Sequence, residues 1–227
     1  MMENRVIAID GPAGSGKSSV AKLVGEQLGF LHVDSGALYR IMTWQALLAG
    51  VDTADEAAVA ACAAGVEVEF EPTDKAVVFK VGGELPGDAL RSAEVNQHAS
   101  PVARVVAVRD KVTAWLRSLR ELGDIIVEGR DITSVVFPDT PARFYLDAAP
   151  EVRALRRHRE EVAKGITQQS EAEVLASLLN RDRIDSTRKV APLKLAPGGM
   201  RIDTSELSLT EVVSEVVSRV PAFWRGS

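Results

Sequence analysis

The chain has 227 residues, of which 46% are hydrophobic, so it is long enough for one domain with a substantial buried core. Its net charge of −5 argues against general nucleic-acid binding, which usually needs an excess of Lys and Arg. The single cysteine excludes an intrachain disulfide, and no apolar run approaches the ~20 residues of a membrane span. Because the first residues show no secretory signal pattern, we expect a cytoplasmic protein without nucleic-acid or membrane partners.

Short apolar runs alternate with helix-like stretches along the chain. In chain order, the runs predict buried strands at residues 6–10, 30–33, 125–128, 143–147 and 200–203. Helices are expected at about residues 17–28, 37–49 and 209–220, and the polar, Arg-rich stretch 153–188 is also expected to be helical. This alternation predicts an α/β fold with a mainly parallel sheet flanked by helices.

Residues 65–87 interrupt this rhythm. Apolar and polar residues alternate from Val66 to Phe70 and again within residues 76–81, with Pro72-Thr73-Asp74 between the two runs. Strict alternation indicates strands with one solvated face, and the intervening residues favour a turn. The sequence therefore predicts a small antiparallel β-containing insertion on the α/β core.

A glycine-rich loop follows the first predicted strand and precedes the first predicted helix. It fits the pattern GxxxxGK[ST] completely and consists of Gly11, Pro12, Ala13, Gly14, Ser15, Gly16, Lys17 and Ser18. The glycines allow backbone N–H groups to surround phosphate oxygens, and the helix N-terminus adds further donors. Lys17 would bring a positive charge to the β- and γ-phosphates, and the Ser18 hydroxyl could ligate Mg²⁺. This loop together with Ser19 is therefore the expected ATP site. The loop pattern alone does not identify the molecule that accepts the phosphoryl group.

Polar residues follow two other predicted strands. Asp34 and Ser35 precede a helix and could simply cap it, whereas Arg40 would lie at the ligand edge of the sheet. Arg130 and Asp131 follow the strand at 125–128; they could form a surface ion pair, but a charged pair at the end of a buried strand is typical of a site.

The segment from Asn180 to Arg188 is dense in charge. On a helix, Arg181, Asp185 and Arg188 share one face, which could equally be an ordinary solvated face. Arg109 has a weaker case by itself. A nucleoside monophosphate is a dianion near pH 7, however, and several Arg side chains are the usual means of binding it.

These motifs together resemble the bacterial cytidylate kinases, over nearly the whole chain. The resemblance rests on the runs 10–18, 34–40, 129–131 and 135–139, on Leu90-Arg91-Ser92-Ala93-Glu94-Val95, and on Arg188 with Val190-Ala191-Pro192-Leu193. It implies phosphoryl transfer from ATP, with Mg²⁺, to CMP or dCMP by a protein with a P-loop kinase fold, which is expected to be a monomer. It also implies a core at 1–64, 101–153 and 169–227, an insertion at 65–100 over the acceptor, and a short helical lid at 154–168.

The resemblance further implies roles by position. Lys17, Arg130 and Arg188 are expected to be catalytic, with Arg188 approaching the phosphates during transfer. Arg157 is expected to contact ATP, and Arg156, Arg157 and Arg159 are expected to belong to the lid. The residues expected to bind CMP are Ser35, Arg40, Ser100, Arg109, Arg130, Asp131, Arg181, Asp185 and Arg188, with Ser100, Arg181 and Asp185 on the sugar.

Two features depart from the family pattern. Ala196-Pro197-Gly198-Gly199 stands where many members have an acidic residue, which affects the expected adenine contacts. The strand at 125–128 ends in Glu128 where an Asp is standard, so no carboxylate ligand for Mg²⁺ is assigned beside Ser18, although Asp34 could act through water.

Three other functions share part of this pattern. An adenylate- or shikimate-type kinase would share the fold and Lys17, but the insertion and the context of Arg130 favour the cytidylate type. A regulatory GTPase needs an Asn-Lys-x-Asp motif, and the sequence has none. A nucleotide-binding module without catalysis would not need so many arginines at the ligand edge.

Overall fold

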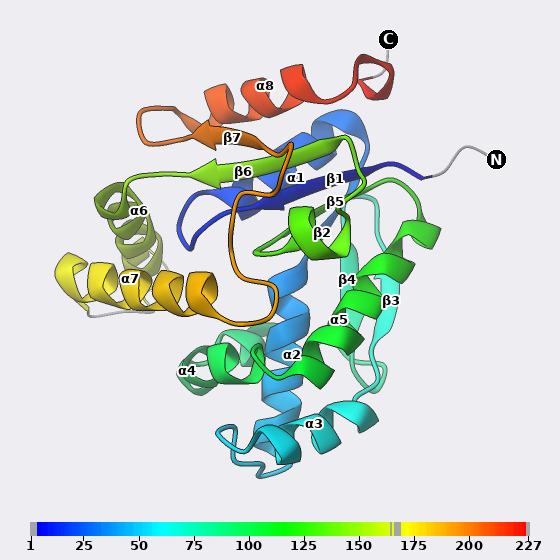
Figure 1. Cartoon of the computed structure of the whole chain (residues 1–227), viewed down its shortest axis with the longest axis vertical. Helices are drawn as coiled ribbons and strands as arrows, with labels where there is room; N and C mark the ends of the chain where they lie inside the picture. Colours follow the sequence, from blue (N-terminus) through cyan, green and yellow to red (C-terminus); the bar gives the residue numbers. More distant parts are fainter. Residues whose placement is uncertain (1–3, 164, 166–168, 226–227) are drawn as a thin grey trace.

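A five-stranded parallel sheet forms the centre of the computed structural model, which describes residues 4–163, 165 and 169–225 (Figure 1). The strand order is β2-β5-β1-β6-β7, and every neighbouring pair is parallel. The strands are β1 (Val6–Asp10), β2 (Leu31–Asp34), β5 (Ile125–Gly129), β6 (Ala142–Asp147) and β7 (Met200–Asp203). The predicted α/β fold with a mainly parallel sheet is therefore confirmed.

Helices cover both faces of this sheet, which explains why β1 is apolar without alternation. Val6 and Ala8 pack into one core cluster, whereas Ile7 and Ile9 pack into the other. The first cluster includes side chains of α2 (Ser35–Leu48), α3 (Glu56–Gly65), α4 (Ala93–Val102) and α5 (Val106–Ser118), and the second includes side chains of α1 (Lys17–Leu28) and α8 (Leu209–Arg219). A strand buried on both faces needs apolar side chains in both directions.

The predicted polar helical stretch forms two helices, α6 (Pro150–Ala163) and α7 (Glu171–Thr187), which lie side by side near the carboxyl ends of the strands (Figure 1). Ser170 caps α7 in a capping box with Glu173, so the sequence itself marks where the second helix begins. The remaining helical elements are η1 (Gly87–Arg91), η2 (Leu119–Leu122), η3 (Ile132–Val136) and η4 (Ala222–Trp224).

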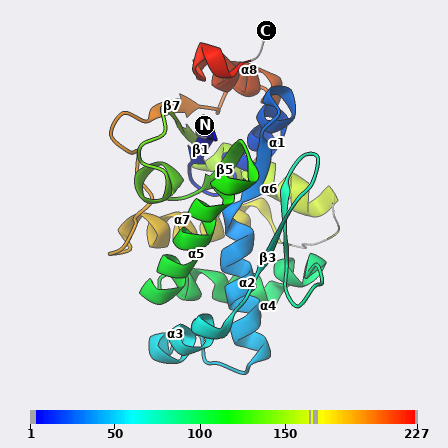
Figure 2. The same ribbon diagram turned by 90° about the vertical axis from the view of Figure 1, so that its right-hand side faces the viewer.

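The predicted antiparallel hairpin is also confirmed. It consists of β3 (Glu69–Pro72) and β4 (Val77–Lys80), which run beside α2 in Figure 2. Phe70 packs edge-on against Phe79 of the partner strand and against Trp115 of α5, with ring centroids 5.8 and 6.0 Å apart. The N–H of His32 donates to the carbonyl of Lys75 over 2.9 Å, so the hairpin also contacts the outer strand β2.

Several predicted boundaries differ by one or two residues. The second strand is Leu31–Asp34 instead of 30–33, and α2 begins at Ser35 instead of residue 37. The reason is the cap: the Asp34 carboxylate accepts from the N–H of Ala37 over 3.3 Å, so the helix begins directly after the strand.

The division into core, insertion and lid stays a prediction. The insertion range 65–100 contains the hairpin, η1 and most of α4, and the predicted lid at 154–168 begins within α6. Residues 164 and 166–168 of that lid lie outside the described residues. In the part of the chain that the structure describes, none of the helices combines the length and apolar character needed to cross a membrane.

Candidate active site

The carboxyl ends of the strands place the predicted site residues at one edge of the sheet. Asp10 at the end of β1 is in register with Gly129 of β5, and Asp34 at the end of β2 is in register with Glu128. Because parallel strands end at the same edge, the glycine-rich loop after β1 lies next to the segment that begins with Arg130. The predicted ATP residues 11–19 form this loop and the first turn of α1.

The loop has a backbone shape that requires glycine. Gly14 and Gly16 have φ values of 77° and 89°, a region in which L side chains are strained. At Gly11, a Cβ atom would lie 2.0 Å from the carbonyl oxygen of Leu146. Gly16 is the N-cap of α1, so the free N–H groups of the helix N-terminus open toward the loop.

Lys17 is buried against this loop. Its ammonium donates to the carbonyl of Pro12 over 2.7 Å and lies 3.4 Å from the Ser15 hydroxyl. Burial, together with the positive charge of Arg130, lowers the pKa of Lys17 to about 7. A bound phosphate would supply the negative charge that favours the ammonium form, so this buried cation is suited to a polyanionic ligand.

Glu128 is a functional candidate that the sequence prediction left unassigned. The Ser18 hydroxyl donates to Oε1 of Glu128, which reaches it from the neighbouring strand β5. Burial, then the nearby charge of Asp34, raises the pKa of Glu128. The available signal was a carboxylate at the end of a fully buried strand.

A hydroxyl and a carboxylate are oxygen ligands of the kind that Mg²⁺ prefers. Ser18 and Glu128 therefore fit a magnesium ion at the phosphate loop. No cluster of three or more His, Cys, Asp or Glu side chains suited to a metal occurs among the described residues.

Asp10, also missed by the sequence prediction, connects β1 to the segment after β5. Its buried carboxylate accepts from the backbone N–H groups of Ile132 and Thr133, over 2.9 and 2.7 Å, and from the Thr133 hydroxyl over 2.6 Å. Burial raises the pKa of Asp10 to about 6. This carboxylate therefore fixes the turn η3, which directly follows Arg130 and Asp131.

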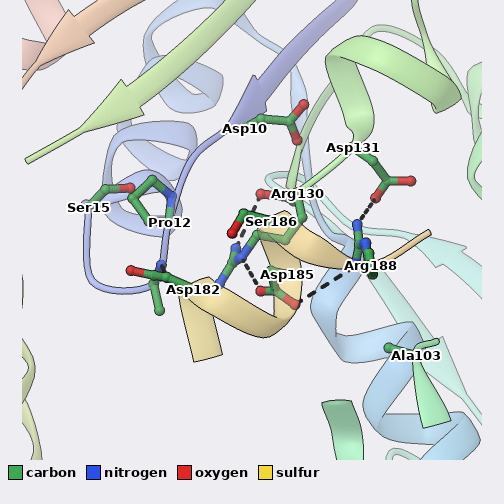
Figure 3. Close-up of polar contacts among 12 residues, drawn as sticks. Asp10, Pro12, Ser15, Ala103, Arg130, Asp131, Asp182, Asp185, Ser186 and Arg188 are labelled. Atoms are coloured by element: carbon green, nitrogen blue, oxygen red, sulfur yellow. Dashed lines mark hydrogen bonds and ion pairs between the residues drawn. The ribbon is translucent and has the colours of Figure 1, made fainter. Parts of the chain in front are cut away.

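Asp131 lies between two arginines from different elements. Arg109 of α5 pairs with it at Oδ2. Arg188, labelled beside Asp131 in Figure 3, lies 3.5 Å from Oδ1. Arg109 also donates to the carbonyl of Ala103 over 3.0 Å, and Arg188 donates from Nε to the carbonyl of Ala191 over 2.6 Å. These contacts bring three predicted CMP residues together, including Arg109, whose sequence signal was weak.

Asp185 provides a second carboxylate beside these arginines, and we call Asp131, Asp185, Arg109, Arg130 and Arg188 the arginine cluster. It accepts from Nε of Arg130 over 3.2 Å and lies 3.8 Å from Nη1 of Arg188 (Figure 3). The alternative of a surface pair between Arg130 and Asp131 is therefore wrong, because each pairs with a partner from another element. The alternative of a solvated helix face is also wrong: Asp185 is buried, and burial lowers the pKa of the nearby Arg181 to about 10.

The remaining predicted residues occupy varied positions. The alternative role of Ser35 as a helix cap is wrong, since its hydroxyl donates to the carbonyl of Glu128 over 2.6 Å. Arg40 lies 3.7 Å from the Asp34 carboxylate at the same edge.

The other predicted residues lie on helices. Ser100 is partly buried on α4, whereas Arg157 pairs with Glu161 of its own helix over 2.5 Å. Arg156, also expected in the lid, donates to the Thr204 hydroxyl over 2.9 Å.

Comparison with known proteins identifies the family. The family model described as cytidylate kinase matches residues 7–222. The chain belongs to the cytidylate kinase family. A cytidylate kinase of Geobacillus thermodenitrificans is 40% identical over 220 residues, which cover 96% of this chain and 98% of that relative. One of Mycobacterium leprae (strain Br4923) is 41% identical over 220 residues, or 96% of each chain.

A distant solved structure shares the fold of this cytidylate kinase family member. An uncharacterized protein from Eubacterium ventriosum ATCC 27560 has a TM-score of 0.54 at 11% sequence identity, with 96% of this chain and 99% of that chain covered. The predicted family is thus confirmed, and the comparisons do not favour the adenylate- or shikimate-type alternative. Membership implies a nucleotide phosphoryl donor and a small nucleotide acceptor, whereas the roles of single residues stay predictions.

Proposed function

We propose that this protein transfers the γ-phosphoryl group of ATP to CMP and dCMP, giving CDP and dCDP. The observation that carries this proposal is the position of Arg130, which follows the strand in register with Asp10 at the start of the phosphate loop and pairs with Asp185 of α7. The donor loop and the arginine cluster thus share one edge of the sheet, with cations on both sides of the place where phosphoryl transfer would occur. Family membership supports the choice of cytidylate as acceptor.

The chemistry requires positioning and charge neutralisation more than a strong base. An acceptor phosphate oxygen is largely ionised near neutral pH and can attack the γ-phosphorus in line with the leaving oxygen. Lys17, Arg130 and Arg188 would neutralise the charge that is shared among the phosphates. The ion pairs of Arg130 and Arg188 and the hydrogen bond from Lys17 to the Pro12 carbonyl hold these side chains before the substrates bind, so little reorganisation is needed.

A magnesium ion would be held by Ser18, with Glu128 as a direct ligand or through water. It would supply additional positive charge to the β- and γ-phosphates. The hydrogen bond from Ser18 to Glu128 supports this assignment, because it places the hydroxyl and a carboxylate next to the loop.

The acceptor would contact the cluster formed by Asp131, Asp185 and their arginines. Arg40, Arg109 and Arg130 are suited to its phosphate, and Ser35 with Asp131 to the cytosine. Ser100, Arg181 and Asp185 would reach the sugar. We further propose a cytoplasmic monomer that needs no nucleic-acid or membrane partner.

A coupled assay of ADP release tests the function. ATP with Mg²⁺ is supplied with CMP, dCMP, UMP, AMP, GMP or shikimate in turn, and we expect strong turnover with CMP and dCMP. Lys17→Ala should abolish this turnover, whereas Lys22→Ala, at an exposed position of the same helix, should retain it. Turnover with AMP or shikimate and none with CMP would contradict the proposed acceptor.

A further inference from the structure

A buried ion pair lies against the middle of the phosphate loop and has no role in the expectations from sequence. Arg153 of α6 and Asp182 of α7 form this pair, and their side chains are only 6% and 17% exposed. Figure 3 shows Asp182 beside the loop that carries Pro12 and Ser15. Arg153 also donates from Nε to the carbonyl of Ala148 over 2.9 Å, which fixes the orientation of its guanidinium.

Both members of the pair bind the backbone of the same loop residue. Nη1 of Arg153 donates to the carbonyl of Ala13 over 3.0 Å, and the N–H of Ala13 donates to Oδ1 of Asp182 over 3.2 Å. Ala13 lies between a strand and a helix, so its backbone groups have no partner in regular secondary structure. Because an unpaired buried backbone group is costly, these two bonds favour one conformation of the loop.

Packing restricts the loop at the same place. The Ala13 side chain belongs to a small apolar cluster with Ala154 of α6 and with Val174 and Leu178 of α7. A Cβ atom at Gly14 would lie 2.9 Å from the carbonyl oxygen of Arg153, so the α6 backbone lies directly against the loop. The two helices therefore support the first half of the loop, whereas Lys17 and α1 define the second half.

We propose that Arg153 and Asp182 are positioning residues that hold the phosphate loop in the shape that receives ATP. This inference rests on the proposed function and assigns to it two residues that do not themselves need to touch a substrate. The acceptor groups of α7 have an independent attachment, since Asp185 pairs with Arg130 and its carbonyl accepts from the N–H of Leu193 over 2.8 Å. Loss of the pair should therefore weaken ATP binding more than CMP binding.

Direct titration calorimetry with ATP·Mg²⁺ and, separately, with CMP tests this proposal. For Asp182→Ala we expect the Kd of ATP to rise about tenfold, the loss typical of one charge-assisted hydrogen bond, and the Kd of CMP to change less than about twofold. Asp182→Asn keeps an oxygen for the Ala13 N–H and should show a smaller rise. The matched control is Asp124→Asn, which breaks the pair with Arg5 at the opposite end of the sheet and should leave both affinities unchanged.

A second variant keeps the test decisive if a lone buried charge prevents folding. R153M/D182L removes both charges together, which proteins tolerate better than the loss of one partner. We expect this folded variant to lose ATP affinity as Asp182→Ala does. Unchanged ATP affinity in a folded variant, or an equal loss for ATP and CMP, would overturn the proposal. Failure of the wild type to phosphorylate CMP would instead contradict the proposed function and leave the ATP titration as an independent result.

Discussion

Nε of Arg130 donates to the carboxylate of Asp185 over 3.2 Å, although the first residue follows β5 and the second lies on α7. This contact joins the sheet edge to α7, the helix that also carries Arg181.

For Asp185→Asn we expect the Kd of CMP to rise about tenfold, because Arg130 and Arg188 both lose a charged partner. The Kd of ATP should stay within about twofold. Asp110→Asn, an exposed neighbour of Arg109, is the control, and calorimetry measures both affinities.

Arg188→Ala should lower kcat by about two to four orders of magnitude, as expected for the loss of a cation at the transferring phosphoryl group. The fold should survive, because Asp131 keeps Arg109 and Asp185 keeps Arg130 as partners. Arg188→Lys retains the charge but not the forked geometry and should be intermediate. Steady-state kinetics measures kcat of each variant, and thermal unfolding checks that the variants are folded. Arg183→Ala, at an exposed position of α7, is the control and should keep the wild-type kcat. Near-normal turnover in Arg188→Ala would remove this residue from the transition state.

Glu128→Gln tests the metal assignment. Glutamine keeps an oxygen that can accept from Ser18 but lacks the negative charge that attracts a cation, so the Mg²⁺ concentration for half-maximal activity should rise about tenfold or more. Excess Mg²⁺ should restore much of the rate. Glu26→Gln, on the solvent side of α1, should leave the Mg²⁺ dependence unchanged. A variant with reduced activity at every Mg²⁺ concentration, and no shift in the midpoint, would exclude Glu128 from metal binding.

Asp10 should make the protein less stable as the pH rises from about 4 to about 6. Burial raises its pKa from 3.8 to about 6, so the folded state binds more protons than the unfolded chain between these values. The free energy of unfolding then falls with increasing pH in this window, and the full pKa difference corresponds to about 3 kcal/mol.

The comparison of wild type with Asp10→Asn isolates this effect, because the amide does not titrate. Urea unfolding at several pH values should show the stability of the wild type declining relative to the variant between pH 4 and pH 6 and remaining parallel above it. Parallel stability curves throughout this range would mean that Asp10 is ionised in the folded protein from low pH.

Charged residues near the ends of buried strands could be assigned to the site from sequence, but their partners could not. The loop from Gly11 to Ser18 was identified because its spacing is fixed by local backbone chemistry. Arg109 had almost no signal, since a single arginine outside any recognised motif is usually exposed. Only the fold shows that it pairs with Asp131, which follows a strand 22 residues later.

The sequence by itself determined the alternation of strands and helices, the hairpin, the phosphate loop and the family, because each of these depends on local patterns or on the order of motifs. The tertiary structure alone decided which groups the buried carboxylates contact. Glu128 accepts a hydrogen bond from the Ser18 hydroxyl, Asp10 from the backbone of the turn after Arg130, and Asp182 from the N–H of Ala13. Such contacts join residues more than a hundred positions apart, and their geometry is set by strand order and helix packing, which no local pattern in the chain encodes.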